Sequence, residues 1–153
     1  MTLTPEQERE RAAALRRTPA EVAALCGTSQ RKIYLALWIP RITWECWSRG
    51  VYAPLPSEWL AIQYVLGIYD HPAARPESDL TTDDAETALA RTPKEIARAL
   101  GVTLKQLAED ISAEYKTVRT WSDGSRKPTA HLYLALQAVL GLYRHPASRL
   151  TEK

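Results

Sequence analysis

Four cationic side chains, with a tyrosine and a threonine beside them, are concentrated in one short stretch of the C-terminal half of the chain. They are Tyr115, Lys116, Arg119, Thr120, Arg126 and Lys127. Ammonium and guanidinium groups donate hydrogen bonds to anionic oxygens, and the arginine fork donates two parallel bonds to a planar acceptor. A single exposed lysine is most often an ordinary solvated charge. The six residues therefore form a candidate site only if the fold brings them together on one side of the molecule.

Tyr115, Lys116, Arg119 and Thr120 would lie on a short helix from about Glu114 to Trp121, with Val118 and Trp121 turned inward at i, i+3 spacing, and Arg126 and Lys127 would follow beyond the helix. Asp123-Gly124 marks its end. The opposite face of the helix then carries Lys116 and Arg119. We expect this helix to be the third of four in the C-terminal half.

The other three helices follow from caps and apolar spacing. The first covers residues 93–100 and ends at Gly101, and the fourth begins after Pro128 and runs nearly continuously apolar to Leu140. The second continues to Ile111 and opens at Thr103-Leu-Lys-Gln106, which has the form of a capping box. No stretch alternates with period two, so the fold class is predicted to be all-α.

The chain repeats itself with a spacing of 74 residues. Residues 17–75 align without a gap on residues 91–149, with 22 identities over 59 positions. We infer two copies of one helical unit, 1–75 and 91–153, joined by a connector at 76–90. The connector carries five acids and no cation, a net charge of −5, whereas residues 17–75 carry +2 and residues 91–149 carry +5. The connector is expected to become helical midway, after the Thr81–Asp84 run.

Residues 107–128, LAEDISAEYKTVRTWSDGSRKP, resemble the helix-turn-helix of lambda-repressor/Cro-type regulators, also called the xenobiotic-response-element type. Ala108 fills the place of the small residue where the two helices cross. The matching hydrophobic positions and the matching ending are Leu107, Ile111, Val118, Trp121, Gly124, Arg126 and Pro128. Ser112 departs from the family, whose turn commonly has glycine. The resemblance covers residues 93–142 and implies two tandem lambda-repressor-like bundles of four to five short helices each.

The resemblance also implies a sequence-specific DNA-binding transcriptional regulator. The third helix would enter the major groove, where Arg119 contacts guanine and Lys116 contacts guanine or phosphate. Tyr115 and Thr120 would reach phosphates or a thymine methyl, and Arg126 and Lys127 would clamp the DNA backbone. Because one half-site gives little specificity, a homodimer on an inverted repeat is expected, with half-sites ~34 Å apart. Proteins of this kind repress their own or a neighbouring promoter in phage-like or mobile-element operons.

The first repeat lacks these cations. Lys116 and Arg119 correspond to Ile42 and Glu45, and Arg126 and Lys127 to Tyr52 and Ala53. Eight of the twelve aromatic residues lie in this copy, namely Tyr34, Trp38, Trp44, Trp47, Tyr52, Trp59, Tyr64 and Tyr69. Tryptophan and tyrosine are common interface anchors as well as core residues. We predict a degenerate repeat that dimerises or binds a partner, with Trp38 and Tyr52 in the interface.

Two other function classes remain open. One is a protein-interaction adaptor whose helix-turn-helix no longer binds DNA. The other is a pseudo-dimer in which both units of one chain contact an asymmetric site. Catalysis has little support, because no nucleophile–base spacing, glycine-rich phosphate loop or paired in-helix carboxylates stand out.

Cysteine and histidine point to packing rather than to metal chemistry. Cys26 and Cys46 form no CxxC pair and are expected to be free and buried. His71 and His145 occupy equal places in the two repeats, which argues for shared packing, and no metal or cofactor is expected. No apolar run reaches the ~20 residues of a membrane span, and no secretion signal is visible. A cytoplasmic location is therefore expected.

Overall fold

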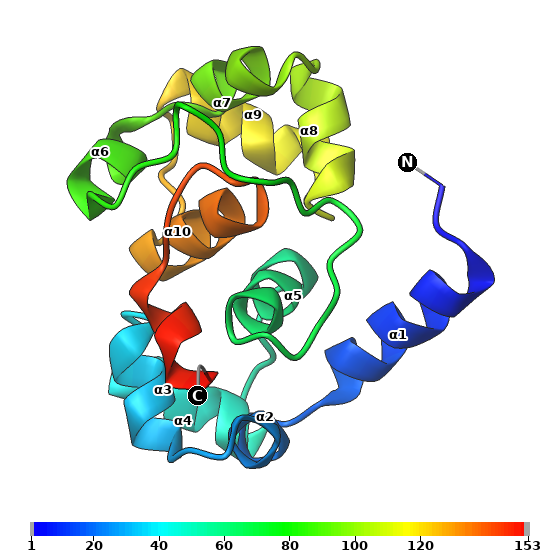
Figure 1. Ribbon diagram of the computed structural model, residues 1–153, viewed down its shortest axis with the longest axis vertical. Coiled ribbons are helices and arrows are strands. Elements are labelled where there is room, and N and C mark those ends of the chain that lie inside the picture. Colours follow the sequence, from blue (N-terminus) through cyan, green and yellow to red (C-terminus); the bar gives the residue numbers. More distant parts are fainter. Residues whose placement is uncertain (1, 152–153) are drawn as a thin grey trace.

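The computed structural model describes residues 2–151, apart from the side chains of Arg149 and Thr151. Met1, Glu152 and Lys153, at the outer ends of the two expected units, lie outside the described residues. The fold is all-α, as predicted, and the described residues contain no β-strand (Figure 1). The helices are α1 (Pro5–Arg16), α2 (Pro19–Cys26), α3 (Gln30–Ala36), α4 (Arg41–Arg49), α5 (Pro56–Val65), α6 (Ala85–Ala90), α7 (Pro93–Leu100), α8 (Leu104–Asp110), α9 (Tyr115–Asp123), α10 (Ala130–Val139) and the 3₁₀ helix η1 (Pro146–Thr151).

The helix boundaries follow the 74-residue spacing of the sequence. Adding 74 to the bounds of α2, α3, α4 and α5 gives the bounds of α7, α8, α9 and α10. The same shift places α6 on the last six residues of α1, so the connector becomes helical midway, as expected. The sequence repeat is therefore also a repeat of secondary structure.

Matched caps explain why corresponding helices begin and end together. Thr18 and Thr92 each form a capping box, in which the threonine hydroxyl and a glutamate three residues later satisfy each other's backbone amide. A proline follows each threonine in the first turn, where its missing N–H costs nothing. Gly27 and Gly101 then end α2 and α7 in the left-handed conformation.

The helices α5 and α10 pack against each other at the centre of the molecule (Figure 1). Both are buried on nearly every side, which suits their almost continuously apolar sequences. In Figure 1, α7, α8 and α9 lie above this pair, and α2, α3 and α4 lie below it. Near the start of α10, His131 Nε2 lies 2.5 Å from Glu58 Oε2 on α5, and both side chains are buried. The central pair therefore includes one buried polar contact between the repeats.

Equivalent arginines at the start of each repeat hydrogen-bond to its central helix and to the residues that follow that helix. The Arg17 Nη1 group donates to Gln63 Oε1 and to the Ile68 carbonyl, both at 2.9 Å. Its counterpart Arg91 donates to Gln137 Oε1 at 3.2 Å and to the Leu142 carbonyl at 2.9 Å. The amides of Gln63 and Gln137 donate in turn to the carbonyls of Ala14 and Ala88. The RTP sequence common to both repeats thus supplies a packing arginine as well as a helix cap.

The tail of each repeat packs on the other repeat. After α5, the Arg75 amide donates to the Val139 carbonyl at 2.9 Å, and Arg75 Nη1 reaches the Leu100 carbonyl at 3.4 Å. After α10, η1 packs on α3. One cluster of buried apolar side chains accordingly draws members from both repeats. The limits of the expected units, 1–75 and 91–153, stay a prediction.

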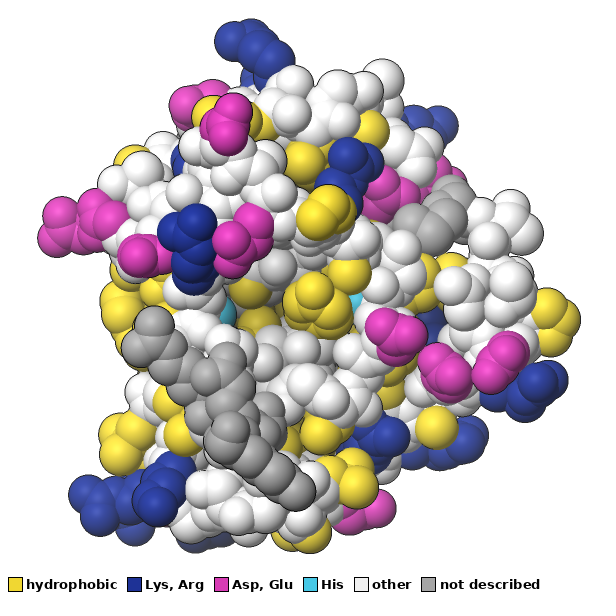
Figure 2. Space-filling view, in the orientation of Figure 1, with side chains coloured by type: hydrophobic (Ala, Val, Ile, Leu, Met, Phe, Trp, Pro, Cys, Tyr) yellow, Lys and Arg dark blue, Asp and Glu magenta, His cyan; other side chains and the backbone are white. Residues whose placement is uncertain are grey.

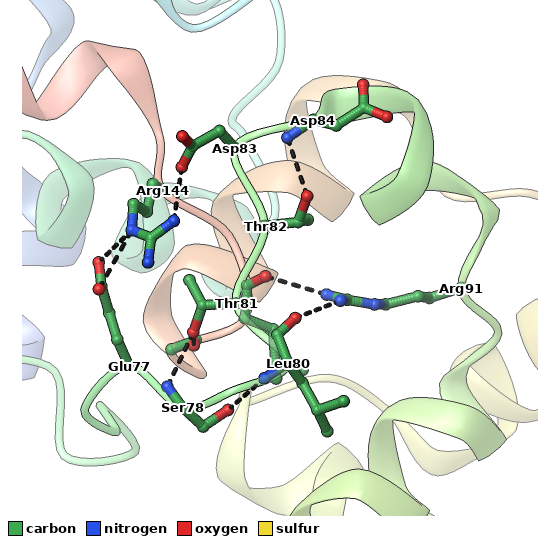
Figure 3. Close-up of polar contacts among 11 residues, drawn as sticks. Glu77, Ser78, Leu80, Thr81, Thr82, Asp83, Asp84, Arg91 and Arg144 are labelled. Atoms are coloured by element: carbon green, nitrogen blue, oxygen red, sulfur yellow. Dashed lines mark hydrogen bonds and ion pairs between the residues drawn. The ribbon is translucent and has the colours of Figure 1, made fainter.

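The acidic connector lies along the end of the second repeat (Figure 3). Arg144 is paired with Glu77 at 3.1 Å and with Asp83 at 2.8 Å. Thr82 forms an isolated parallel bridge with Tyr143, through a Thr82 N–H bond to the Leu142 carbonyl and an Arg144 N–H bond to the Thr82 carbonyl. The Asp84 side chain then caps α6 by accepting from the Glu86 amide. The connector is therefore an ordered part of the fold.

Candidate nucleic-acid interface

The inner side of the α8–α9 pair is locked into the core. Leu107, Ala108, Ile111 and Val118 are all buried, with exposed fractions of 3% or less. The Trp121 ring packs edge-on against Tyr133 of α10, with 6.3 Å between the ring centroids. The inward positions predicted from the spacing of Val118 and Trp121 are confirmed. Only the opposite side of α9 is free to meet a partner.

The cap of α8 differs in one respect from its prediction. Thr103 accepts from the Gln106 amide at 3.0 Å, as a capping residue does. Gln106 does not complete the box, because its side chain donates to Asp110 Oδ1 at 2.8 Å, one turn further along α8. The prediction of a reciprocal capping box at Thr103 was therefore wrong in its second half.

The turn between α8 and α9 has the backbone that a glycine would adopt. Ser112 has φ of +61°, in the left-handed region. Hydrogen bonds from the Ser112 and Ala113 amides to the carbonyls of Glu109 and Ala108 hold the turn at 3.1 and 2.9 Å. Ala108 lies beneath it with 1% exposure. Serine in place of glycine thus leaves the turn closed, at the cost of a strained backbone.

The outer face of α9 carries three of the six candidate residues in exposed positions. Tyr115, Lys116 and Arg119 are exposed, and the Arg119 guanidinium lies 5.7 Å from the centre of the Tyr115 ring. Lys116 and Arg119 are three residues apart and therefore share one face. Thr120 is half-buried, and its hydroxyl donates to the Thr117 carbonyl at 2.6 Å. Thr120 therefore presents less of its side chain than the other three.

The loop after α9 brings the remaining two cations next to the helix. Gly124 ends α9 with φ of +84°, and the Arg126 amide donates to the Thr120 carbonyl at 3.3 Å. Arg126 and Lys127 are both exposed. Asp123 is the nearest acid in the sequence, and hydrogen bonds from the Ser125 hydroxyl and amide lower its pKa, with smaller contributions from the charges of Arg119 and Lys94.

The four cations have no acidic partner within residues 2–151. The ion pairs formed there involve Arg41, His131 and Arg144, and none involves Lys116, Arg119, Arg126 or Lys127. The connector acids Glu77 and Asp83 are paired with Arg144 instead. The end of α9 therefore presents four cations outside any ion pair, beside an exposed tyrosine and the exposed Asp123 carboxylate, whose charge interacts with that of Arg119.

The corresponding face of the first repeat is apolar. Trp38 and Tyr52, the two predicted interface residues, are 50% and 48% exposed, and Ile42, in the place of Lys116, is 72% exposed. The remaining charges at the start of α4 neutralise each other, because Arg41 Nε lies 2.9 Å from Glu45 Oε1. The sequence-based prediction did not include Ile42, because it named only aromatic residues for the interface of the first repeat.

Most of the other aromatic residues of the first repeat are core. Trp44, Trp47 and Trp59 are each no more than 6% exposed, and their rings lie within 6.0 Å of one another. The Trp44 indole N–H donates to Gln30 Oε1 at 2.8 Å. Trp38 is therefore distinguished from these three tryptophans by its exposure, which cannot be told from the residue type.

The equivalent histidines are packing residues. The Nδ1 atoms of His71 and His145 accept from the amides of Ala73 and Ala147, each at 3.1 Å, and the rings pack edge-on against Tyr69 and Tyr143. Burial lowers the pKa of each imidazole to about 4. No group of three His, Cys, Asp or Glu side chains within the described part of the chain is arranged to hold a metal ion.

The chain matches no protein family, and no curated protein or solved structure is significantly similar to it. Over the described residues, no helix has the length and apolar character needed to cross a bilayer.

Proposed function

We propose that the protein is a sequence-specific DNA-binding transcriptional regulator that reads its operator through α9. Arg119 and Lys116 contact base edges or nearby phosphates in the major groove, and Tyr115 and Thr120 contact the flanking backbone. Arg126 and Lys127 hold the backbone from the loop after α9. By its resemblance to lambda-repressor/Cro-type regulators, the protein represses its own or a neighbouring promoter.

The observation that carries this proposal is the contrast between the two sides of α9. The inner side is anchored by Val118, at 0% exposure, whereas the outer side and the following loop present four exposed cations that form no ion pair within residues 2–151. A helix anchored in this way projects its outer side chains into a groove wide enough to admit it. Releasing counterions from phosphates favours binding by such cations.

Titrating the protein against DNA from upstream of its own gene tests the proposal. Fluorescence anisotropy at two salt concentrations gives the affinity and its salt dependence. We expect Arg119→Ala to weaken specific binding by ~1–3 kcal/mol and to relax the preference at one base pair. We expect Lys127→Ala to weaken binding to all sequences alike and to reduce the salt slope by about one unit.

Arg9→Ala is the matched control, because Arg9 is an exposed cation on α1 and lies outside both α9 and its counterpart in the first repeat, α4. It should leave both the affinity and the salt slope as in the unmodified protein. Equal effects of all three substitutions would mean that binding follows net charge alone. If Arg119→Ala and Lys127→Ala both left binding unchanged, the proposed DNA-binding face would be wrong.

The exposed apolar side chains of the first repeat favour a second candidate, a protein-interaction adaptor that does not bind DNA. Trp38 and Ile42, at 50% and 72% exposure, are the residues that such an adaptor would use. It predicts a protein complex insensitive to salt and no DNA complex at either salt concentration. A pseudo-dimer that contacts DNA with both repeats predicts instead a monomer bound to an asymmetric site.

A further inference from the structure

The first repeat exposes large apolar side chains at places where the second repeat carries polar ones. Nine large hydrophobic residues are exposed within residues 2–151, and six of them lie between Leu35 and Leu55. A shift of 74 residues places all six on polar residues of the second repeat, between helices of equivalent bounds. The pairs are Leu35 and Glu109, Trp38 and Ser112, Ile42 and Lys116, Val51 and Ser125, Tyr52 and Arg126, and Leu55 and Thr129. The shared scaffold therefore does not require apolar side chains at these places.

Trp38 is exposed in spite of an unfavourable backbone. Its φ of +64° lies in the left-handed region, which bulky side chains rarely adopt. The equivalent Ser112 has a similar φ of +61° with a much smaller side chain. Trp38 is nevertheless 50% exposed. Neither the turn nor the core accounts for a tryptophan at this position, but a partner surface does.

Cations flank the apolar residues around this turn. Leu35, Trp38 and Ile42 are 59%, 50% and 72% exposed and follow one another from the end of α3 to the start of α4. Arg31 lies four residues before Leu35, and Arg49 lies seven residues after Ile42, so each shares a helix face with an apolar residue. We call this surface the α3–α4 face, and its members are Leu35, Trp38 and Ile42 with the charged residues Arg31, Lys32, Arg41, Glu45 and Arg49. In Figure 2, hydrophobic side chains lie beside Lys and Arg side chains at the lower left, where α3 lies in Figure 1.

The charge of the α3–α4 face disfavours a second copy of the chain and DNA as partners. Glu45 is paired with Arg41 at 2.9 Å, and the five charged members together have a net charge of +3. Two copies of the face would bring like charges together across a two-fold axis. Leu35 and Ile42, on either side of the turn, offer no hydrogen-bond donor to base edges.

A protein segment with both carboxylates and apolar side chains fits the face better than a lipid surface does. An anionic lipid surface is continuous, so it would meet the Glu45 carboxylate as well as the cations. A protein segment can place its acids opposite the cations alone and its apolar side chains at the centre. The combination of charge and exposure therefore favours an acidic protein partner.

We propose that the α3–α4 face binds a short acidic segment of another protein. Apolar side chains of that segment pack on Leu35, Trp38 and Ile42 and supply most of the affinity, and the surrounding cations select acidic sequences. Of the two roles expected for the first repeat, dimerisation and partner binding, this is the second. The α4 and α9 helices lie at opposite ends of the molecule in Figure 1, so the segment leaves α9 uncovered. The inference holds whether or not α9 binds DNA.

Selection from a phage-displayed library of random segments of about 16 residues tests the chemistry of the partner. The target is the immobilised full-length protein, and the control target is its variant with Leu35→Glu, Trp38→Ser and Ile42→Lys. The second repeat carries these residues at the same places, so the variant should keep the circular dichroism spectrum of the unmodified protein. Segments retained by the target and not by the control should combine aspartate or glutamate with large apolar residues.

Fluorescence anisotropy of one selected segment, synthesised with a label, separates the contributions to binding. The triple variant, and Trp38→Ser alone, should each raise the dissociation constant at least about tenfold. Converting the carboxylates of the segment to amides should weaken its binding to the unmodified protein about tenfold, and its binding to the variant with Arg31→Gln and Lys32→Gln much less. Arg119→Ala and Leu80→Lys are the controls, because Arg119 is an exposed cation of α9 and Leu80 is 51% exposed on the connector. Both should leave the dissociation constant unchanged.

The proposal is overturned if the selection retains no segment, or retains segments without acidic residues. Binding that Trp38→Ser does not weaken, or that Arg119→Ala weakens equally, would place the segment elsewhere and also reject it. Sedimentation with vesicles of phosphatidylcholine and phosphatidylserine, and ultracentrifugation of the protein alone, test the other occupants. Vesicle binding or a dimer that the triple variant abolishes would assign the face to lipid or to a second copy instead.

Discussion

Two residues at equivalent places in the repeats, His71 and His145, show how burial fixes a charge state. Each imidazole accepts a backbone N–H at Nδ1, so Nε2 carries the proton, and Nε2 has no hydrogen-bond partner among the described residues. Protonation of Nδ1 would break that bond and bury a charge. Both effects favour the neutral ring, and burial is the larger cause of the lowered pKa.

We expect the free energy of unfolding to fall as the pH is lowered from 6.5 to 4. In this interval the unfolded imidazoles, with a pKa of 6.5, take up protons, whereas the folded ones, with a pKa of about 4, resist. Unfolding then binds up to two extra protons, which corresponds to a slope of up to about 2.7 kcal/mol per pH unit. Above pH 7 both histidines are neutral in both states and this dependence disappears. Urea unfolding at pH 5, 6 and 7.5 measures it.

The double variant His71→Gln and His145→Gln identifies the source of the slope. Glutamine retains an acceptor for the backbone amide but does not titrate. The variant should therefore lose most of the pH dependence between 6.5 and 5, even if its stability at pH 7.5 is lower. An unchanged slope would assign the dependence to other groups.

At the scale of single elements, the backbone of Arg75 and Pro76 passes close to the end of α10. Gly141 has φ of +75°, and a Cβ built on it would lie 2.3 Å from the Pro76 carbonyl oxygen and 2.6 Å from that of Arg75. Both contacts are with backbone, which cannot swing away as a side chain does. The end of α10 therefore requires glycine for two reasons, the positive φ and the close approach of the connector.

We expect Gly141→Ala to destabilise the protein more than Gly101→Ala. Gly101 has a similar φ of +70° but nothing within 4 Å of a built Cβ, so its substitution measures backbone strain alone. That strain is worth ~1–2 kcal/mol, and steric overlap at Gly141 adds ~1–3 kcal/mol. Urea unfolding of both variants gives the difference. Equal losses would mean that the connector moves away from α10 at no cost.

At the scale of the whole molecule, the repeats share their core. Apolar residues of both copies form one buried cluster, and each tail packs on the opposite repeat. The Glu58–His131 contact adds a buried polar link between α5 and α10. Loss of either repeat would leave the central helix of the other exposed to water, at a large cost in buried apolar area.

We therefore expect the two repeats to unfold in one cooperative transition. Four of the five tryptophans, Trp38, Trp44, Trp47 and Trp59, report on the first repeat, whereas far-ultraviolet circular dichroism reports on every helix. The two signals should give the same midpoint. Gly141→Ala, in the second repeat, should lower the midpoint seen by tryptophan fluorescence as much as that seen by circular dichroism. Separate midpoints would show that the repeats fold independently.

Much of the local structure could be predicted from the sequence, because it depends on interactions between residues that are close together in the chain. The threonine–proline–glutamate caps, the left-handed glycines and the inward residues Val118 and Trp121 all act within one or two helical turns. The all-α class follows from them, and the 74-residue repeat predicts which helices correspond. The Gln106 side chain shows the limit of such reasoning, because it could accept from the Thr103 amide or donate to the Asp110 carboxylate, and in the structure it donates to Asp110.

The sequence by itself determined the helices, their repeat and the location of cations in one copy and aromatic residues in the other. Only the tertiary structure decided which aromatic residues are exposed, since Trp38 and Trp44 differ not in chemistry but in what packs over them. It also decided that the connector lies on the second repeat and that each tail crosses to the other copy. Helix signals are local and short-ranged, whereas burial and docking depend on contacts between residues far apart in the chain, which no local pattern specifies.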